Sequence, residues 1–431
     1  MIVLVLGNLM APLAALGVVL AFLLSPRRRV LRGLPAELSE RFGSLPDEAR
    51  RALAGRPVLW VHAASAGEVL AVDGLIRTLK SGAAAPAVLL SCTTMAGREA
   101  AKRLGAADAA VIAPLDCWPA VTRFLDAAKP YSLILVETEL WPNMIAAASR
   151  RGLKIGLVNG RLSERSFSRY LLARPLLAPF LRKVCRLAVQ GEADGERFRA
   201  LGAPEGSVLV VGNMKYDRVK VPDTAAAAQR LRSLGWAGAP VFVAGSTHPG
   251  EEEAVLGAFL SAQARHPALK LVIAPRHAER AADTAASLKN RGVTFTSWSA
   301  CESAPASDCL LIDRLGPLAS FYPSATVSFV GGTLVPVGGH NILEPALAGS
   351  PVLFGPHTAH TRQAAELLAS AGCGHVVSDQ AELAARLDDA LSSPQRTRAQ
   401  GEQARRLARG LQGATERTLA HLAAVTRPPG R

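Results

Sequence analysis

Residues 58–80, VLWVHAASAGEVLAVDGLIRTLK, contain the clearest strand-to-helix unit of this chain. Val58 to His62 is a run of bulky side chains, which is typical of a strand buried on both faces of a parallel sheet. Small residues at 63–67 precede a helical pattern from Val69 to Lys80. The segment therefore predicts a strand, a tight turn and a helix, the repeating unit of a doubly wound α/β sheet.

The same unit recurs along the chain and starts afresh at Pro240. In the first half, a predicted helix at 97–104 alternates with predicted strands at Ala87–Ser91, Ser132–Val136, Lys154–Val158 and Leu187–Gln190. The second half begins with a strand at Val241–Ala244 and a helix at Glu251–Arg265, followed by strands at Leu269–Ile273, Cys309–Ile312, Thr326–Val330 and Pro351–Phe354. We expect an α/β protein with two Rossmann-like domains that face a cleft.

Length and composition agree with two folded domains. A chain of 431 residues exceeds one ordinary core, and 49% hydrophobic with 19% charged residues excludes disorder. The six cysteines form no CxxC pair, which argues against a zinc ribbon or a disulfide scaffold. The formal net charge of +14 predicts an acidic partner, which would be nucleic acid, anionic lipid or a phosphorylated small molecule.

The first residues predict a membrane anchor. Ile2 to Leu24 carries no charge and is long enough for a helix across about 30 Å of hydrocarbon. Arg27, Arg28, Arg29 and Arg32 follow at once, which places the rest of the chain in the cytoplasm by the positive-inside rule. A cleaved signal peptide or a hairpin in one leaflet is the alternative, although no basic segment precedes the apolar run.

Composition divides the chain into five expected segments. These are an anchor at 1–25, an N-terminal Rossmann-like domain at 26–218, a linker at 219–238, a C-terminal Rossmann-like domain at 239–393, and a helix with a basic tail at 394–431. The linker assignment rests on Pro222, Gly235 and four consecutive alanines between them. The last segment has eight Arg against two Glu and no strand signal, so we expect a terminal helix and a loose tail.

Carboxylates follow two predicted strands of the first half. In HAASAGE (62–68), small residues leave room for a ligand, and Glu68 is placed to accept a proton from a substrate hydroxyl. The same carboxylate is equally suited to complement the dipole of the following helix. In ETELWPN (137–143), two acids and Trp141 leave the sheet together, which favours a functional site.

Basic residues follow other strands. Arg161 and Arg165 of NGRLSERS suit either a ligand or a solvated helix face, and Lys215 of GNMKYD is placed near the domain edge. Arg276 of PRHAER follows a strand, where its guanidinium is suited to grip a phosphate as a fork. Alone, none of these motifs identifies a ligand.

Residues 331–345, GGTLVPVGGHNILEP, are the most informative stretch. Gly338 and Gly339 allow close backbone approach, and the N–H groups of the helix that follows suit a phosphate. Glu344 is suited to hold a ribose diol. This combination indicates a nucleotide site, with a purely structural glycine-rich turn as the alternative.

Two further features are assigned bland roles. Glu251 and Glu252 begin a helix, and we expect them to complement its dipole. His357 to His360, HTAH, has no apparent third ligand, so we expect no metal there.

Together these motifs resemble the Kdo transferases, which move deoxy-manno-octulosonic acid (Kdo) from a CMP-activated donor to the lipid A precursor in lipopolysaccharide synthesis. The resemblance runs in order through the anchor, HAASAGE, ETELWPN, NGRLSERS, NMKYD, GSTHPGEE, APRHAER, GGTLVPVGGHNILEP and GPHT. It implies the glycosyltransferase B architecture and an inverting transfer at the cytoplasmic face of the inner membrane, without cofactor or metal. The implied partners are CMP-Kdo, the lipid A precursor (lipid IVA) and an anionic membrane surface, but no nucleic acid.

The resemblance also implies roles for individual residues. It makes Glu68 the general base, and it assigns action on the transition state to Glu137 and Lys215. It places the CMP site on Pro275, Arg276, Leu315, Gly316, Pro317, Asn341, Ile342, Leu343 and Glu344. One segment departs from the family pattern D-T-x-G-E-L, because Arg314 replaces Thr and Pro317 replaces Glu. Pro317 has no N–H, which puts its CMP contact in doubt.

Two rival functions are compatible with part of the pattern. One is a membrane-surface transferase of the same architecture with a UDP-sugar donor. The other is a membrane-tethered scaffold that binds nucleic acid or anionic lipid through the Arg-rich ends. The scaffold is less well supported, because only 5% of residues are aromatic and the Arg residues are not interleaved with them.

Overall fold

The computed structural model describes residues 34–82, 85–219, 223–300 and 307–428. The predicted anchor at 2–24 lies outside these residues. Within the described ranges, no helix combines the length and apolar character needed to cross a bilayer. The described residues divide into two compact units: unit 1 comprises those up to Arg218 and from Gln412 onward, and unit 2 comprises those from Val219 to Leu411.

Unit 1 is built on a seven-stranded sheet whose neighbouring strands are all parallel, in the order β3-β2-β1-β4-β5-β6-β7. The strands are β1 (Val58–His62), β2 (Ala87–Cys92), β3 (Ala109–Ile112), β4 (Pro130–Val136), β5 (Lys154–Gly160), β6 (Val184–Val189) and β7 (Val208–Val210). Every residue of β1 and β2 is buried, as the continuous apolar runs predicted.

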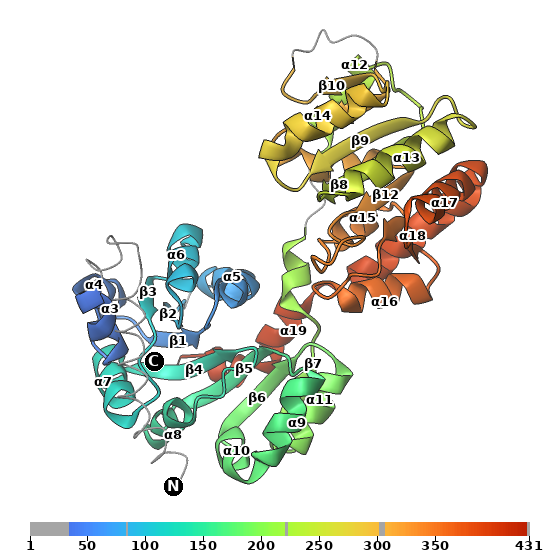
Figure 1. The fold of residues 1–431 in the computed structure, drawn as a ribbon. Helices are drawn as coiled ribbons and strands as arrows, with labels where there is room; N and C mark the ends of the chain where they lie inside the picture. Colours follow the sequence, from blue (N-terminus) through green and yellow to red (C-terminus); the bar gives the residue numbers. More distant parts are fainter. Residues whose placement is uncertain (1–33, 83–84, 220–222, 301–306, 429–431) are drawn as a thin grey trace. The chain divides into compact units, whose positions relative to one another are not determined.

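Helices cover both faces of this sheet (Figure 1). One face packs against α4 (Asp47–Leu53), α7 (Trp118–Ala128), α8 (Pro142–Arg150), α9 (Glu164–Leu172), α10 (Arg174–Leu181) and α11 (Glu192–Ala200). The other packs against α5 (Ala66–Lys80), α6 (Met95–Leu104), the 3-10 helix η1 (Met214–Arg218), α19 (Ala414–His421) and α20 (Ala423–Thr426). Helix α3 (Leu34–Arg41) lies at the β3 edge, where Glu40 accepts a hydrogen bond from Ile112 N at 2.6 Å.

Unit 2 repeats the plan with a second seven-stranded parallel sheet, in the order β10-β11-β9-β8-β12-β13-β14. Its strands are β8 (Val241–Thr247), β9 (Lys270–Pro275), β10 (Phe295–Ser297), β11 (Cys309–Leu311), β12 (Val327–Val330), β13 (Val352–Phe354) and β14 (Gly374–Val376).

One face of the unit 2 sheet packs against α13 (Glu251–Gln263), α14 (Ala281–Asn290) and α17 (Gln380–Ser392). The other packs against α12 (Ala225–Ser233), η3 (Pro317–Ser324) and α15 (Leu343–Ala348). Helices α16 (Arg362–Ser370) and α18 (Pro394–Gly410) pack beside α15 and β14, and the short η2 (Ala278–Arg280) follows β9. Two parallel-sheet α/β domains are therefore confirmed.

The structure corrects two segment assignments. The described part of the predicted linker at 219–238 is not a bare linker, because Ala227, Leu231 and Trp236 are buried in the core of unit 2. The chain after α18 is not a loose tail, because Leu422 and Val425 are buried against the sheet of unit 1. The alanines at 225–228 favour a helix as readily as a linker, and the apolar residues of the tail find a sheet face to cover.

Each sheet has a point where the direction of strand addition reverses. In unit 1 it lies between β1 and β4, and in unit 2 between β8 and β12. Ligands of open α/β sheets bind beyond the carboxyl ends of the strands at such points. These two places are therefore where functional side chains are expected.

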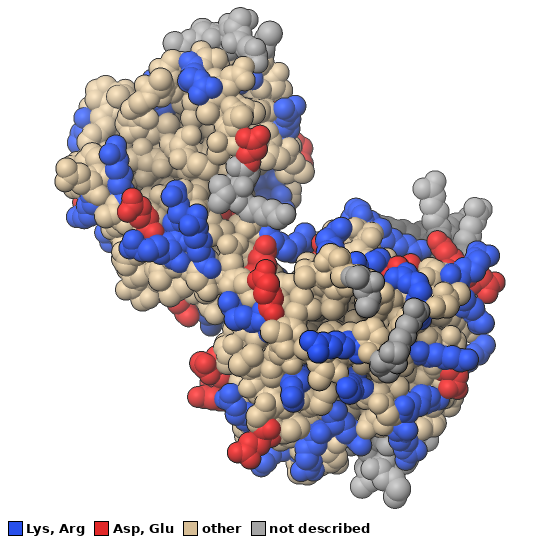
Figure 2. Space-filling view, turned by 180° about the vertical axis from the view of Figure 1, so that it is seen from behind, with Lys and Arg blue, Asp and Glu red and all other residues tan. Residues whose placement is uncertain are grey.

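The surface is strongly basic. Figure 2 shows that Lys and Arg prevail over Asp and Glu on the face that it presents, in agreement with the net charge of +14.

Candidate active site

In unit 1, acidic residues come together around the switch point between β1 and β4. Glu68 lies in the first turn of α5, which follows β1, whereas Glu137 and Glu139 follow β4. Both Glu137 and Glu139 act to raise the pKa of Glu68, so the three carboxylates lie close enough to interact. The structure thus brings together acids from two separate motifs, as strand-end placement predicted.

Glu68 is a buried residue whose carboxylate accepts two hydrogen bonds. Its Oε2 accepts a hydrogen bond from Ala64 N at 2.8 Å, and its Oε1 accepts one from the Ser65 hydroxyl at 2.8 Å. Ser65 in turn caps α5 by accepting from Glu68 N at 3.4 Å. These contacts resemble a capping box, so Glu68 has a structural role at the helix start. Burial nevertheless outweighs the two hydrogen bonds and raises the pKa of Glu68 above its ordinary value.

Glu137 and Lys215 form an ion pair in unit 1. Lys215 Nζ lies 2.9 Å from Glu137 Oε1, and Asn159 Nδ2 donates to the same oxygen at 3.4 Å. Asn159 Oδ1 also accepts a hydrogen bond from Met214 N at 3.1 Å, which fixes the segment that carries Lys215. Two residues assigned together by the resemblance are therefore direct neighbours.

Glu139 is held in its ionised form by a histidine and an indole. Burial acts to raise its pKa, but His62 and Trp141 outweigh burial, and the pKa of Glu139 lies below its ordinary value. Trp141 Nε1 donates to Glu139 Oε2 at 2.6 Å. His62 Nε2 lies 3.7 Å from the same oxygen, which is an ion-pair separation rather than a hydrogen bond.

His62 is 1% exposed, and its Nε2 has no hydrogen-bond partner among the described residues. Its Nδ1 lies 2.9 Å from Ser91 Oγ, which also accepts a hydrogen bond from Trp60 Nε1 at 2.8 Å. If the Ser91 hydroxyl donates to Nδ1, the Nε2 of His62 carries the proton. That proton then faces Glu139 in the acidic site.

Backbone strain marks the same strand ends. Among the described residues, four that are not glycine have a positive φ: Lys129, Glu137, Asn159 and Ser246. Glu137 follows β4, Asn159 lies at the end of β5, and Ser246 lies at the end of β8. Such conformations cost on the order of 1–3 kcal/mol each and concentrate at functional sites. The strain therefore supports the choice of both switch points.

In unit 2, a cavity of about 370 Å³ gathers predicted nucleotide residues from separate strand ends. Pro275 and Arg276 come from the end of β9, and Glu344 from α15. Of the other predicted residues, Leu315, Gly316 and Asn341 also line it. The described part of unit 2 therefore offers one concave surface to which most of the predicted donor residues contribute.

The cavity presents cations and one carboxylate. Arg276 and Arg314 have no acidic partner within the described ranges of the chain, and Arg314 lies over the Trp298 ring at 5.8 Å. Burial raises the pKa of Glu344, against the hydrogen bond that Asn341 Nδ2 donates to it at 3.1 Å. Sequence reasoning treated Arg314 only as a departure from the family pattern, whereas the structure places it on the cavity wall.

Three predicted donor residues do not line this cavity. Ile342 and Leu343 are fully buried in unit 2, and Pro317 begins η3. The helix that was expected to offer N–H groups to phosphate, α15, has six residues and begins at Leu343. Ile342 and Leu343 therefore pack in the core of unit 2, and their neighbours Asn341 and Glu344 line the cavity.

Glu251 has a role that sequence reasoning missed. Its carboxylate is 1% exposed and accepts four backbone hydrogen bonds, from His248 N (2.9 Å), Gly332 N (2.7 Å), Thr333 N (3.0 Å) and Leu334 N (2.9 Å). It thus ties the loop after β12 to the loop after β8, across the switch point. A carboxylate that only complements the helix dipole would be exposed to solvent, whereas Glu251 is buried. The only sign of its role in the sequence was the glycine-rich stretch GGT, where backbone N–H groups are available to an acceptor.

A histidine pair lies at the same loops. His248 Nε2 and His340 Nε2 are 2.7 Å apart, and the rings are stacked with centroids 5.0 Å apart. Burial lowers the pKa of His340 to about 4, with help from the neighbouring His248 and Arg276. At this distance one imidazole donates a proton to the other, so at least one of them is neutral.

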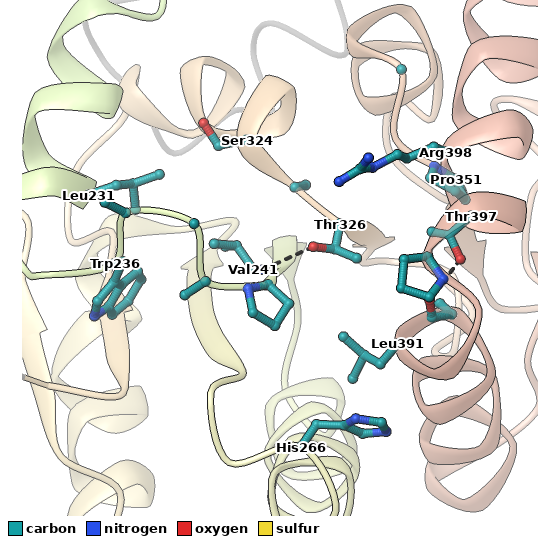
Figure 3. Close-up of a pocket in the computed structure, with 18 of the residues that line it drawn as sticks. Leu231, Trp236, Val241, His266, Ser324, Thr326, Pro351, Leu391, Thr397 and Arg398 are labelled. Carbon is teal, nitrogen blue, oxygen red and sulfur yellow. Dashed lines mark hydrogen bonds between the residues drawn. The ribbon is translucent and has the colours of Figure 1, made fainter.

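A larger cavity, of about 620 Å³, lies at the other end of the unit 2 sheet (Figure 3). Val241 begins β8, and Thr326 and Pro351 lie just before β12 and β13, so this cavity faces the amino ends of the strands. Thr326 Oγ1 already accepts a hydrogen bond from Val241 N at 3.1 Å. Because parallel sheets bind ligands at their carboxyl ends, the smaller cavity is the better candidate.

Comparisons with known proteins give consistent matches. A family model described as 3-deoxy-D-manno-octulosonic-acid transferase (kdotransferase) matches residues 36–218. A 3-deoxy-D-manno-octulosonic acid transferase from Bordetella pertussis is 35% identical over 393 residues, which covers 88% of this chain and 89% of that protein. A bifunctional glycosyltransferase/methyltransferase from Fusobacterium nucleatum is 35% identical over 329 residues, which covers 74% of this chain but only 49% of that relative.

Among solved structures, the UDP-GlcNAc 2-epimerase from Neisseria meningitidis bound to UDP-GlcNAc is similar with a TM-score of 0.56. It is 15% identical, and the match covers 85% of this chain and 100% of that chain. At this identity the likeness concerns the fold alone, and it agrees with two α/β domains.

Proposed function

Because the chain belongs to the family of 3-deoxy-D-manno-octulosonic acid (Kdo) transferases, we propose that it moves Kdo from CMP-Kdo to lipid IVA with Glu68 as general base. The chain is a glycosyltransferase of lipopolysaccharide synthesis. The donor, the acceptor, the roles of individual residues and the inverting course are the parts that we propose.

The observation that carries the proposal is the cavity in unit 2 with its unpaired cations. When the sugar departs, the leaving group CMP carries one phosphate group. Arg276 and Arg314 line the cavity and are suited to neutralise the negative charge of this phosphate without a metal. Glu344, held by Asn341, is suited to accept hydrogen bonds from the ribose diol. Among the described residues, no group of three or more His, Cys, Asp or Glu is arranged to hold a metal ion.

In the proposed step, Glu68 accepts the proton of the acceptor hydroxyl. The hydroxyl oxygen then forms a bond with the anomeric carbon of Kdo, while the bond from that carbon to the phosphate oxygen breaks and CMP leaves with the electron pair. One displacement of this kind inverts the anomeric centre. A raised pKa suits the role, because a base is most effective when its pKa approaches the working pH.

The ion pair of Glu137 and Lys215 is proposed to act on the transition state. Glu137 has a strained backbone with a positive φ, and the backbone N–H of Lys215 donates a hydrogen bond to Asn213 Oδ1, so both charges are held in place before the substrate arrives. Preorganised charges stabilise developing charge without reorganisation during the reaction.

The reaction is proposed to occur at the cytoplasmic face of the inner membrane. Residues 2–24 would anchor the chain there, followed by the basic cluster at 27–32. Such a location brings the enzyme to an acceptor that is itself a lipid.

The test is to incubate the purified full chain with CMP-Kdo and lipid IVA and to weigh the lipid product. We expect a mass increase by Kdo that requires the CMP donor, and stabilisation against heat by CMP but not by UDP. Stabilisation by UDP alone, with no Kdo-modified product, would favour a different nucleotide-sugar donor. Full cellular function of Glu68→Ala would favour a scaffold instead of an enzyme.

A further inference from the structure

The histidine pair of unit 2, His248 and His340, is not used by the function proposed above. His248 lies in the loop after β8 and His340 in the loop after β12, so the two imidazoles come from both sides of the switch point. Their Nε2 atoms are 2.7 Å apart, and the stacked rings have an interplanar angle of 8°. His340 also lines the cavity that holds Arg276 and Glu344. The pair therefore reaches the candidate donor site.

Hydrogen bonds of both loops hold the pair in place. His248 N donates to a buried oxygen of Glu251 at 2.9 Å, and Gly332 N donates to the same oxygen at 2.7 Å. His340 N donates to Gly331 O at 3.3 Å. A Cβ at Gly332 would lie 3.0 Å from His340 Cδ2 and 3.5 Å from His248 Cδ2, so the glycine leaves room for the stacked rings. The paired rings are therefore a built feature of these two loops.

The pair has an N–H donor to spare. A neutral imidazole has one N–H group and one bare nitrogen that accepts a hydrogen bond. Because one Nε2 donates to the other, the ring that accepts carries its own proton on Nδ1. Neither Nδ1 forms a hydrogen bond with the described residues of the chain. One N–H group of the pair is therefore left for a ligand.

Positive charge surrounds the pair. Arg276 lines the same cavity, and its backbone N–H donates a hydrogen bond at 2.9 Å to the carbonyl of the residue before His248. Burial lowers the pKa of both imidazoles, and Arg276 and His277 lower it further. His360 adds to the effect on His340. An anion that reached the pair would therefore meet cations and an N–H donor together.

The acids beside the pair are already engaged. Glu251 and Glu252 act to raise the pKa of His248, against the larger effect of burial. Glu251 accepts four backbone hydrogen bonds, and Glu252 accepts one from Arg280 Nη1 at 2.7 Å. In the part of the chain that the structure describes, neither carboxylate forms a hydrogen bond with an imidazole of the pair. The pair thus lacks an anionic partner that a ligand could supply.

We propose that His248 and His340 bind the carboxylate of the donor sugar and so select a sugar acid over a neutral sugar. This inference rests on the proposed function, and it identifies a part of the donor that unit 2 recognises besides CMP. In CMP-Kdo, the carboxylate and the phosphate oxygen are attached to the same anomeric carbon. A donor whose phosphate lies at Arg276 therefore has its carboxylate close by, at the pair.

The chemistry of the pair suits a carboxylate better than a hydroxyl group. A hydroxyl group would accept the spare N–H but would leave the surrounding positive charge unchanged. A carboxylate accepts the N–H, offsets the charge of Arg276, and allows one imidazole to take up a proton from solvent. A neutral sugar offers none of the last two effects, so the pair would discriminate between the two kinds of donor.

The first test compares CMP-Kdo with its C1 amide, in which a neutral group of similar size replaces the carboxylate. Both ligands and CMP are titrated calorimetrically into the full chain without acceptor, so that no transfer occurs. In His248→Gln and His340→Gln, the amide keeps a polar group near the Nε2 position but cannot become a cation. Each variant should bind CMP-Kdo roughly tenfold or more weakly than the unchanged chain, and should bind CMP and the C1 amide within about twofold of it.

The matched control is His375→Gln. His375 is a partly buried histidine of the outermost strand β14, and burial lowers its pKa as well. It does not line the cavity. Its replacement should leave the affinities for all three ligands unchanged. Unchanged CMP binding in the variants of the pair also shows that they are folded.

Proton uptake is a readout that a packing role would not affect. The pKa of His340 is about 4, and a carboxylate beside it should raise this value by about 1 to 3, to between about 5 and 7. At about pH 6, CMP-Kdo should therefore take up a measurable fraction of one proton on binding, and the C1 amide should take up less. Titrations in two buffers with different heats of ionisation measure this difference, which should vanish in His340→Gln.

Several results would overturn the proposal. Equal losses of affinity for CMP-Kdo and its amide would assign the pair to packing, and weaker binding of CMP would assign it to the phosphate. Unchanged CMP-Kdo affinity in both variants, or equal proton uptake with both ligands, would remove the carboxylate from the pair. An unchanged chain that binds neither CMP-Kdo nor its amide would overturn the proposed function as well. Kdo transfer by the unchanged chain, with an unaltered KM for CMP-Kdo in both variants, would overturn this inference alone.

Discussion

The charged side chains at the two switch points differ in whether they have partners. In unit 1 each carboxylate of the site already has a protein partner: Glu68 has Ser65, Glu137 has Lys215, and Glu139 has Trp141. In unit 2 the cations of the cavity, Arg276 and Arg314, have no acidic partner in the described chain, and the buried Glu251 accepts backbone hydrogen bonds instead. One site is complete by itself, and the other has an uncompensated positive charge.

This difference teaches what each site is built to do. Paired charges cost little to maintain and hold their geometry before a substrate arrives, as a proton-transfer site requires. Unpaired cations beside neutral imidazoles are costly unless an anion joins them, as in a site for a phosphate-bearing ligand. Substitutions in unit 1 should therefore affect turnover, and substitutions in unit 2 should affect binding.

The largest effect is expected for Glu68→Gln in unit 1. The Gln oxygen can still accept the hydrogen bond from Ala64 N, and its amide group can donate to Ser65 Oγ in place of accepting from it. Gln cannot accept the proton of the acceptor, so turnover should fall by about 10² to 10⁴. CMP affinity should not change. In the unchanged enzyme, the acidic limb of the pH–rate profile should lie above the ordinary Glu value, because burial raises the pKa of Glu68 and only its ionised form is active.

Steady-state rates across pH and melting temperatures of the same variant check this prediction. Glu99→Gln, an exposed carboxylate on the neighbouring helix α6, serves as the control. A lowered melting temperature with an intact rate would show that Glu68 is only a capping residue.

In unit 2, Glu251→Ala should lower the free energy of unfolding by about 3 kcal/mol or more, because it leaves buried N–H groups without an acceptor. The matched control is Glu253→Ala on the same helix turn, whose exposed ion pair with Arg291 contributes at most about 1 kcal/mol. Urea unfolding curves of the two variants measure the difference. Equal small losses would contradict the role of Glu251 as the tie between loops.

Arg276→Gln and Arg314→Gln should each weaken CMP binding by roughly tenfold to a hundredfold, since a charge-assisted hydrogen bond contributes about 1.5–3 kcal/mol. Turnover at saturating donor should change less than affinity. Calorimetric titration with CMP measures the effect, with Arg291→Gln as a surface control. Unchanged affinity in both cavity variants would remove CMP from this cavity.

The fold could be predicted where a buried strand is a continuous run of apolar residues. The central strands β1 and β8 begin as uninterrupted apolar runs, VLWV and VFVA, and both were predicted from these runs. The four missed strands, β3, β7, β10 and β14, are the outer strands of the two sheets and have three or four residues each. An edge strand buries less surface, so its sequence carries a weaker apolar signal.

The site was predictable where function follows from a position at a strand end, and unpredictable where it depends on distant contacts. Glu137 and Arg276 were identified as strand-end residues. Glu251 was misjudged because three of its four backbone partners lie 81 to 83 residues away. The terminal segment was misjudged because Asp217 accepts a hydrogen bond from Thr415 N, 198 residues away. No local pattern encodes such pairings.

The smallest predicted effect concerns the protonation of His340, which reports on the positive charge in unit 2. Its pKa is lowered to about 4 in the folded chain by burial, with His248, Arg276, His360 and His277 adding to the effect. As pH falls below its ordinary value of 6.5, the unfolded chain takes up a proton that the folded chain refuses. The associated stability is therefore complete above about pH 6.5 and is lost progressively toward about pH 4.

Replacement of His340 by Asn should remove this dependence. Between neutral pH and about pH 5, the free energy of unfolding of unit 2 should fall less in the variant, by at most about 1 kcal/mol after solvent screening. NMR titration of the imidazole should place its pKa well below 6.5, and saturating CMP should raise it, because a bound phosphate offsets the charge of Arg276. If CMP left the pKa of His340 unchanged, the cations of unit 2 would not be the ones that meet the phosphate, and the contrast between the two sites would lose its functional meaning.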